Sequence, residues 1–528
     1  MSYIDKATVA SPNGYHTGVP FLSRQTELHQ QRLLQMNSEL LSLSSSRDHF
    51  RNPRDDLPPK AICDQSMARY FETFGTVFRI VEWAELREQY ESFWTLPDEQ
   101  IRCENAVMLC LVLAIGNGML PPGQGRLPRS DVLRLLGVAK AWKAAIAEVE
   151  SYSLWLLRVD FLLLLARLVH CTGPPSDAVA SANLVRSAMA ISLHKEPAEA
   201  VAASLSAHDR ERRRRIWYAV LELDVRYALD AGMQPIYLGE WESLPPQPDE
   251  TVPMVIETGE EEIQNPWLLE NLRVQQTALD RSLPLRMKIA HWLNKPRFDA
   301  DHALAQDLTS QLSNMMASPS STASSFSSSS SSSFLEAYVR LVYQRTLLAV
   351  HCPFALTDSH LKSYSQNICL STALSIVSHF CCVDENSPQT ADHPFPYGAC
   401  PLVILVQTNS SFFQNDILPA ALYLCSQLIG SLSASVALDP ANLVAHIPAL
   451  QTNLVTAIDG FVALAERRVA ATDHSEVAYV LPAASMAYYR WERGVQHDCS
   501  GAQTETVQQI VDRIAQACVV LMEGRGSL

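Results

Sequence analysis

The side chains best suited to hold a metal ion lie in one stretch of the C-terminal half. Structural zinc takes four cysteine or histidine ligands, commonly arranged as pairs separated by two to five residues. The stretch HFCCVDENSPQTADHPFPYGAC contains five such side chains, which are His379, Cys381, Cys382, His393 and Cys400. Two of the cysteines are adjacent, and this spacing differs from that of the usual zinc ligands. We therefore predict no metal site here and expect ordinary buried thiols.

Two other titratable residues invite an acid–base interpretation. Asp224 lies among apolar residues, where a buried carboxylate needs a hydrogen-bond donor or a cation as its partner. His194 lies at the end of a helical pattern, near the negative pole of the helix dipole. No second titratable group is paired with Asp224 in the sequence, and a structural role is expected for both residues.

Recognisable enzyme motifs are missing from the sequence. It contains no phosphate-binding loop, no dinucleotide-binding glycine pattern, no HExxH motif and no GxSxG motif. We therefore predict that the chain is not an enzyme, that it has no catalytic residues and that it requires no cofactor.

The densest positive charge lies in HDRERRRRIWYAVLELDVRYALDAGMQP, residues 208–235. Its first part contains five arginines, which are Arg210, Arg212, Arg213, Arg214 and Arg215. Such a run could bind nucleic acid, serve as a nuclear import signal, or form the solvated N-terminal part of a helix. The formal net charge of the chain is -15, which repels polyanions and disfavours a broad nucleic-acid-binding surface.

A helix is the element expected to position these arginines. Ser206 precedes Asp209 by three residues, a spacing close to that of a capping box, and it predicts a helix start. Trp217 and Asp224 then fall on one helical face, and Gly232 can end the helix before Pro235. Acidic residues precede arginines by four positions in three expected pairs: Asp209–Arg213, Glu211–Arg215 and Glu222–Arg226. The arginines are thus expected to begin a packed helix, and the import-signal interpretation stays open.

The composition is that of a folded globular protein, with 47% hydrophobic and 18% charged residues in 528. Helical periodicity dominates, and alternating strand patterns are scarce, so we predict an all-α fold. Twelve scattered cysteines and an N-terminus without an apolar core favour the cytosol or the nucleus. The longest apolar run, residues 153–170, includes Arg158, Asp160 and Arg167, and it is expected to be a core helix and not a membrane span.

The expected domain organisation has one large helical body. Residues 1–25 are predicted to be disordered, and residues 26–46 to form a short amphipathic helix whose leucine seam would permit a coiled coil and a homodimer. Residues 60–528 are expected to form one helical domain with a flexible serine-rich loop at 317–333. The alternative is a true domain boundary at that loop.

Several motifs together resemble a known family. The arginine-rich helix contributes Arg212 to Arg215, Trp217, Asp224, Gly232 and Pro235, and it is followed by EWESLPP at 240–246. Three further motifs occur in the same order as in the family: an aromatic block at 70–94, LVRSAMAISLHKEP at 184–197, which includes His194, and LLAVHCPFA at 347–355. From about residue 65 to 430 the sequence resembles the fungal-specific transcription factor domain, the large helical middle region of fungal zinc-cluster regulators.

One part of the family pattern does not occur in these residues. Family members usually carry a cluster of six cysteines built from CxxC pairs, which binds two zinc ions and reads DNA. No two cysteines here are separated by two residues, and Cys63 is the one cysteine among the first hundred residues. Direct sequence-specific DNA binding is therefore not expected. A second explanation is that an upstream exon encoding the cluster is missing from the sequence.

The resemblance implies a nuclear transcriptional regulator of a fungal pathway or of a secondary-metabolite gene cluster. We expect it to act through a DNA-binding or transcriptional partner protein, to reach DNA only indirectly, to respond to a small-molecule effector, and to make no membrane contact. The alternative is a helical enzyme or metabolite-binding protein of a biosynthetic pathway, with a pocket lined by convergent polar groups.

Overall fold

The computed structural model describes residues 57–490 except for 97–102, 121–124, 147–152, 171–176, 198–204, 238, 248–265, 297–300, 317–333, 357–361, 382–400, 408–411, 433–447, 472–481, 484 and 487–488. The predicted N-terminal segments 1–25 and 26–46 and the predicted serine-rich loop 317–333 lie outside the described residues.

The described residues form α-helices and contain no strand, which confirms the all-α prediction. The helices are, in chain order, α3 (Lys60–Glu72), α4 (Phe74–Phe78), α5 (Trp83–Thr95), α6 (Cys103–Asn117), α7 (Arg129–Ile146), α8 (Leu154–Val169), α9 (Asp177–Ala190), α11 (Ala207–Ala231), α12 (Pro266–Leu293), α13 (His302–Met316), α14 (Phe334–Ala355), α15 (Lys362–Cys381), α16 (Pro401–Gln407), α17 (Gln414–Gly430) and α19 (Pro448–Ala471).

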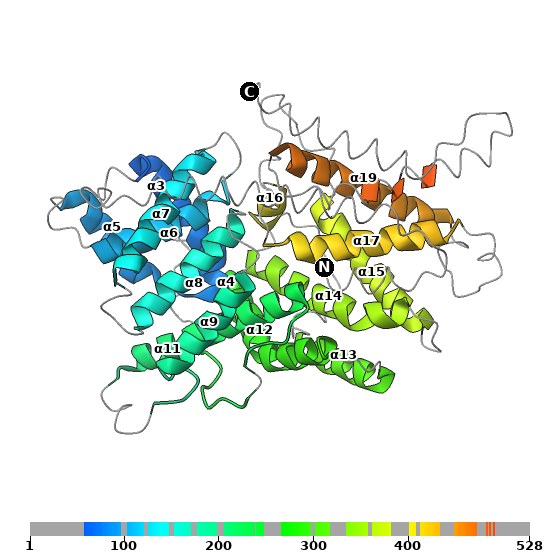
Figure 1. Ribbon diagram of the computed structural model, residues 1–528, viewed down its shortest axis with the longest axis horizontal. Helices are drawn as coiled ribbons and strands as arrows, with labels where there is room; N and C mark the ends of the chain where they lie inside the picture. The colour runs from blue at the N-terminus through cyan, green and yellow to red at the C-terminus, as the bar shows by residue number, and fades with distance from the viewer. Residues whose placement is uncertain are drawn as a thin grey trace.

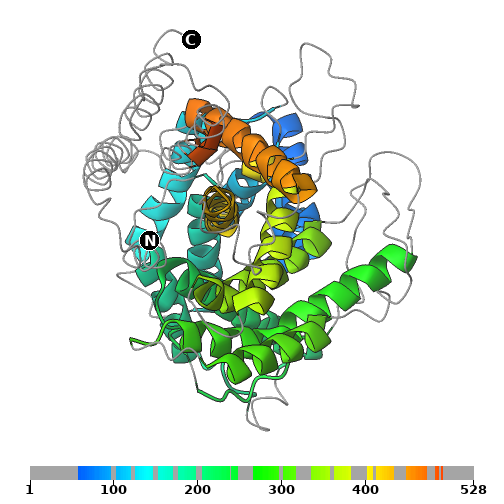
Figure 2. The ribbon, with the colours of Figure 1, turned by 90° about the vertical axis from the view of Figure 1, so that its right-hand side faces the viewer.

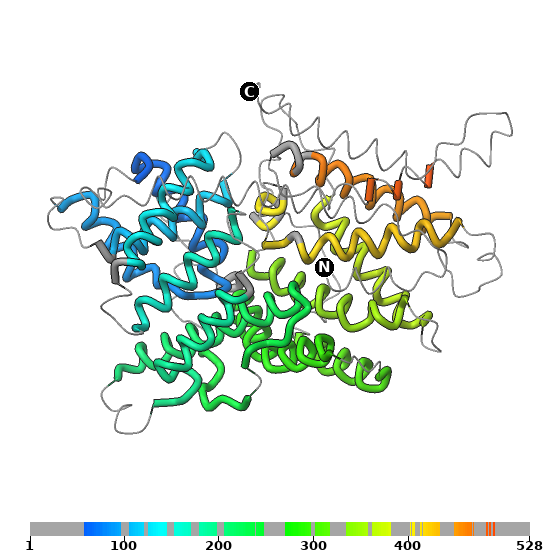
Figure 3. The backbone as a smooth tube through the Cα atoms, viewed as in Figure 1, coloured from blue at the N-terminus to red at the C-terminus, as the bar shows by residue number. Residues whose placement is uncertain are grey.

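The helices are arranged in three neighbouring groups (Figures 1 and 3). In the first group, α6 packs against α3, α7 and α8, and in the last, α15 packs against α14, α17 and α19. Between them, α11 packs against α9 and α12, and α12 packs against α13 and α14. Figure 2 shows α19 (orange) and the α12–α13 region (green) at opposite edges of the body. The second group joins the first through contacts of α9 with α8 and of α11 with α4.

The two most apolar helices lie inside the first group because they have no polar face to turn toward water. All residues of α6 from Ala106 to Ile115 are buried. In α8 the buried Arg158 donates from Nε to the carbonyl oxygen of Ile80 at 2.9 Å, and it pairs with Glu85 at 2.9 Å. The expected core helix is thus confirmed, with its charge satisfied inside the protein. Within the described ranges, none of the helices has the length and apolar character needed to cross a membrane.

The backbones of α3 and α6 approach so closely that one position requires glycine. A Cβ atom on Gly116 would lie 1.8 Å from the carbonyl oxygen of Ser66, well inside van der Waals contact. Next to this crossing, the buried Asn117 donates from Nδ2 to the Ser66 hydroxyl at 3.2 Å. The first group is therefore fixed by a tight helix crossing that a single methyl group would disturb.

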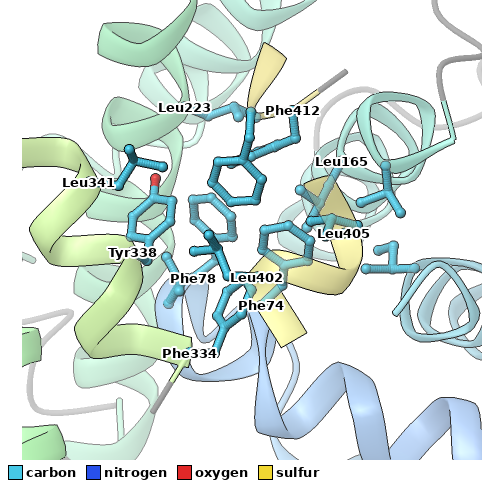
Figure 4. Packing of buried hydrophobic residues seen from close by; sticks show 14 of the residues in the cluster. Phe74, Phe78, Leu165, Leu223, Phe334, Tyr338, Leu341, Leu402, Leu405 and Phe412 are labelled. Atoms are coloured by element: carbon cyan, nitrogen blue, oxygen red, sulfur yellow. The ribbon is translucent and has the colours of Figure 1, made fainter. Parts of the chain in front are cut away.

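A cluster of aromatic rings joins the three groups at the centre of the protein (Figure 4). Phe74 of the short helix α4 contacts Phe334 of α14 and Phe412, with ring centroids 5.3 and 5.1 Å apart. Phe78, one turn later, contacts Phe161 of α8 at 5.1 Å. Such edge-to-face contacts stabilise more than their buried area alone. One continuous core of buried residues extends from Cys63 to Tyr489, whereas the predicted single domain over 60–528 stays a prediction.

Candidate functional site

The helix α11 carries most of the residues that the sequence singles out. The Ser206 hydroxyl accepts a hydrogen bond from the Asp209 amide at 3.0 Å, which confirms the expected helix start. At the other end Gly232 adopts a left-handed conformation with φ of 64°, and its amide donates to the carbonyl oxygen of Ala228. Glycine is favoured there because a side chain would be strained at this φ. Both ends of the helix therefore agree with the sequence prediction.

Two arginines of the run lie close to acidic side chains of the protein itself. Glu82, directly before α5, lies 3.5 Å from Arg212 Nε and 4.0 Å from Arg215 Nη1. The same carboxylate lies 2.7 Å from Nε2 of His208. Arg215 also lies 3.5 Å from Glu211, one turn earlier on α11, as the sequence predicts. These contacts join α11 to the beginning of α5.

Arg213 and Arg214, which lie between Arg212 and Arg215 in the sequence, hold the turn that follows α9. Arg213 donates from Nη2 to the carbonyl oxygens of Ile191 at 2.9 Å and Ser192 at 3.2 Å. Arg214 donates to both carboxylate oxygens of Glu196 at 2.8 and 2.9 Å, and this hydrogen bond is the main cause of the lowered pKa of Glu196. The arginine run is therefore bound within the protein.

His194 and Trp217 meet in an aromatic cluster that also contains Tyr237 and Trp241. The ring centroid of Trp217 lies 6.0 Å from that of His194, 5.5 Å from Tyr237 and 6.3 Å from Trp241. His194 lies in the turn beyond α9 and not at the helix end, which corrects its predicted place near the helix dipole. Burial, followed by nearby Lys195, lowers its pKa, which favours the neutral form of the ring.

Asp224 is buried on the same helix and binds the segment that follows it. One carboxylate oxygen accepts a hydrogen bond from the backbone amide of Ile236 at 2.9 Å, and the preceding Pro235 is buried. Burial raises the pKa of Asp224 to about 6, although this hydrogen bond opposes the shift. The geometry is that of an acid that anchors the chain beyond Gly232, in line with the structural role expected from the sequence.

A first set of buried charges lies deeper, where α11, α12 and α14 meet. Arg286 of α12 donates to both carboxylate oxygens of Glu222 at 2.9 and 2.6 Å, and the Tyr338 hydroxyl donates to the same carboxylate at 3.2 Å. One and a half turns before Arg286, Asp280 pairs with Arg79 at 2.7 Å. The side chains of Arg286 and Glu222 are only 2% and 7% exposed, so this pair is almost fully removed from water.

A second set lies one turn further along α11. Arg226 pairs with Asp416 at the beginning of α17, and its guanidinium group lies 3.9 Å from the ring centroid of Phe412. Arg345 of α14 pairs with the same Asp416 at 2.7 Å and with Asp230 of α11 at 2.7 Å. The two sets together, here called the buried charge network, contain four arginines and four acids: Arg79, Arg226, Arg286, Arg345, Glu222, Asp230, Asp280 and Asp416.

Two of the three expected pairs within α11 are wrong. Arg213 binds backbone carbonyls in place of Asp209, and Glu222 and Arg226 each bind another helix. A pair within one helix is worth only a few tenths of a kcal/mol, so a bidentate partner in a buried site outweighs it. The sequence did contain a signal for the network, because Glu222, Arg226 and Asp230 follow one another at four-residue intervals.

Chemically, the network favours fixed geometry over catalysis. Each of its carboxylates forms an ion pair with at least one guanidinium group, and these charge-assisted contacts fix the positions of the side chains. A buried charge left without its partner is strongly unfavourable, so the bonded arrangement holds α4, α11, α12, α14 and α17 in one relative placement. This network was not predicted from the sequence.

The metal-like stretch is only partly described. His379 and Cys381 lie at the end of α15, whereas Cys382, His393 and Cys400 lie outside the described residues. In the described part of the chain, no three His, Cys, Asp or Glu side chains gather as they would around a metal ion.

Comparison with known proteins identifies a family whose pattern part of this chain matches. Residues 67–277 match the family described as the fungal specific transcription factor domain. This region contains α4 to α11, together with the N-terminal part of α12, and thus the arginine run, the aromatic cluster and Asp224. The charged partners Arg286, Arg345 and Asp416 lie beyond it.

The curated relatives are named as transcription factors. The chain is 28% identical over 345 residues to transcription factor opdR of Penicillium oxalicum, covering 61% of this chain and 42% of the relative. It is 27% identical over 336 residues to transcription factor lepE of Aspergillus flavus, covering 61% and 39%. Transcription factor asR3 of Sarocladium schorii is 26% identical over 272 residues, covering 49% and 30%. The chain therefore spans less than half the length of these relatives, and no solved structure matches it significantly.

Proposed function

This chain contains a fungal specific transcription factor domain, and we propose that it is a transcriptional regulator that acts in the nucleus through protein partners. The observation that carries the proposal is the family match over residues 67–277. The names of the relatives favour a regulator over the enzyme alternative.

Charge and geometry support the indirect mode of action. The four consecutive arginines of α11 contact carboxylates and carbonyl oxygens of this chain, so their positive charge is largely compensated within the protein. The formal net charge of -15 opposes association with duplex DNA. A partner that binds DNA would supply the sequence specificity.

The same contacts bear on nuclear import. A basic import signal must present its side chains to a receptor, whereas Arg213 and Arg214 hold the turn after α9. We therefore do not assign import to this run, and entry with a partner is the proposed route.

The proposed targets are genes of a fungal pathway, such as a secondary-metabolite gene cluster. Deleting the gene and sequencing the transcripts tests this proposal. We expect a defined group of transcripts to change and to recover when the full chain is restored. A lost pathway product with every pathway transcript at its normal level would instead favour the enzyme or metabolite-binding alternative.

The indirect mode has its own test. Purified full-length chain is titrated against labelled promoter fragments of the affected genes and against an unrelated duplex of equal length. We expect no preference for the promoter fragments at physiological salt. Tight and selective binding to one promoter without any partner would contradict the indirect mode while leaving the regulatory role intact.

A further inference from the structure

The outer face of α12 carries a line of positive charge. Arg281 and Lys288 are exposed on the helix, and Lys295 is exposed two residues beyond its end. These three residues, here called the basic ridge, are seven positions apart. At 100° per residue Arg281 and Lys288 deviate by only about 20° around α12, and Lys295 follows beyond the end of the helix. The helix α12 packs against α11, α13 and α14 (Figure 1). Arg281 and Lys288 therefore lie along one exposed stripe of α12.

The basic ridge differs from the arginine run of α11 because no carboxylate among the residues that the structure describes forms an ion pair with it. Within the described residues, no ion pair joins Arg281, Lys288 or Lys295 to a carboxylate. The acids of α12 itself are engaged elsewhere, since Asp280 pairs with Arg79 and Glu270 lies 3.8 Å from Arg273. In a chain with a formal net charge of -15, the ridge places three exposed cations close together in the sequence.

The ridge is also rigidly placed. Asp280, about a quarter turn around the helix from Arg281, and Arg286, on the far side from the ridge, belong to the buried charge network. The apolar residues Leu285, Ile289 and Trp292 pack in a separate cluster with α13 and α14. Arg281 and Lys288 are thus presented from a helix whose position is fixed by buried ion pairs and by apolar packing, as a specific docking surface requires, and Lys295 lies two residues beyond that helix.

We propose that the basic ridge docks an acidic helix of a partner protein, one whose carboxylates recur every seventh residue. Seven residues of an α-helix rise about 10.5 Å, so a partner helix with that repeat presents carboxylates at the same spacing as Arg281 and Lys288 on α12. Duplex DNA fits less well, because it carries one charge per 1.7 Å of axis and a negatively charged chain repels it as a whole.

The acidic helix would belong to a partner through which the proposed regulator acts, so its biological role rests on the proposed function. The binding itself depends only on the charges of the ridge. Three solvent-exposed ion pairs give a weak contact that salt screens, so the complex is expected to form quickly and to weaken as ionic strength rises.

The test uses the full chain and a fluorescein-labelled helical peptide of four heptads with glutamate at every seventh position. The ridge variant R281E/K288E/K295E reverses all three cations. The matched control R134E/R186E/K195E reverses three exposed cations on α7, on α9 and after α9, so that both variants carry the same formal charge. Fluorescence anisotropy at low and physiological salt measures binding, and circular dichroism with thermal unfolding checks that both variants fold.

We expect the ridge variant to bind the peptide at least about tenfold more weakly than the wild type, and the control variant to stay within about threefold. A peptide of equal composition with its glutamates distributed around the helix should bind the wild type more weakly. Equal affinity of the wild type and the ridge variant, or no preference for the heptad peptide, would overturn the proposal. A labelled duplex that binds the wild type and not the ridge variant, with no peptide binding, would reassign the ridge to nucleic acid.

The two proposals fail separately. Peptide binding requires no transcription, so a negative result there removes the ridge as a docking site and leaves the deletion experiment unaffected. Unchanged transcripts after gene deletion would refute the regulatory role even if the peptide bound.

Discussion

The ion pair between Glu222 and Arg286 allows the account of the buried charge network to be tested quantitatively. The proposed perturbations are Glu222→Gln, Arg286→Met and the double variant. Glutamine keeps the shape of glutamate and an acceptor for the Tyr338 hydroxyl, and methionine keeps much of the length of arginine without its charge. Each single change leaves one buried charge without its bidentate partner.

Removing one member of a buried pair typically destabilises a protein by about 3–5 kcal/mol. Here the two single variants should differ. Without Glu222, Arg286 still has Asp280 in its vicinity, whereas without Arg286 the carboxylate of Glu222 loses the guanidinium group that it binds and keeps the Tyr338 hydroxyl, while Asp280 keeps Arg79. Burial already raises the pKa of Asp280, and Arg286 is one of the two cations that oppose this shift. We therefore expect Arg286→Met to be the more destabilising change.

Equilibrium unfolding in urea, followed by tryptophan fluorescence, measures these effects. The double variant has no unpaired charge at this site, and its loss of stability is expected to be smaller than that of either single variant. The control is Arg87→Met, which breaks an exposed pair with Glu91 whose side chains are 45% and 63% exposed and should change stability by less than about 1 kcal/mol. Additive single effects, or single effects as small as that of the control, would refute the reasoning.

Two further predictions concern α11 and the helix crossing. Asp224→Asn keeps an acceptor for the Ile236 amide and removes a carboxyl whose pKa is raised to about 6. This change in pKa corresponds to about 3 kcal/mol in favour of the protonated form in the folded protein. Because the ionised carboxylate is unfavourable above pH 6, the free energy of unfolding of the variant should exceed that of the wild type by about 1–3 kcal/mol at pH 8. The difference should vanish toward pH 4, and a pH-independent difference would contradict this expectation. Gly116→Ala places a methyl group against the Ser66 carbonyl and should lower stability by about 2–4 kcal/mol. In the control Gly430→Ala the added methyl group meets no atom within 4 Å, and thermal unfolding should be nearly unchanged. Equal effects of the two substitutions would show that the helix crossing relaxes.

Much of the fold could be predicted from the sequence. Helical periodicity, the cap at Ser206 and the glycine at 232 are local signals, and local signals are sufficient to define the bounds of α11. The charged residues within the apolar run of residues 153–170 likewise indicated a core helix, because a membrane span disfavours them.

The candidate site was harder to predict because its partners lie far apart in the sequence. Arg226 and Asp416 are separated by 190 positions, and no periodicity relates them. Local pairing rules matched Glu222 to Arg226, whereas burial makes any bidentate partner from another helix the stronger one. A charged residue on an apolar helical face therefore predicts a partner on another helix, although it does not identify that partner.

We propose that this chain regulates transcription through protein contacts once it is brought to a gene. The most direct measurement fuses the full chain to a heterologous DNA-binding domain and records a reporter with matching sites in a fungal cell. The account predicts that reporter expression departs several-fold from that of the DNA-binding domain alone, and that the unfused chain has no effect on the same reporter. Expression equal to that of the DNA-binding domain alone, with the fusion protein present and bound, would contradict it.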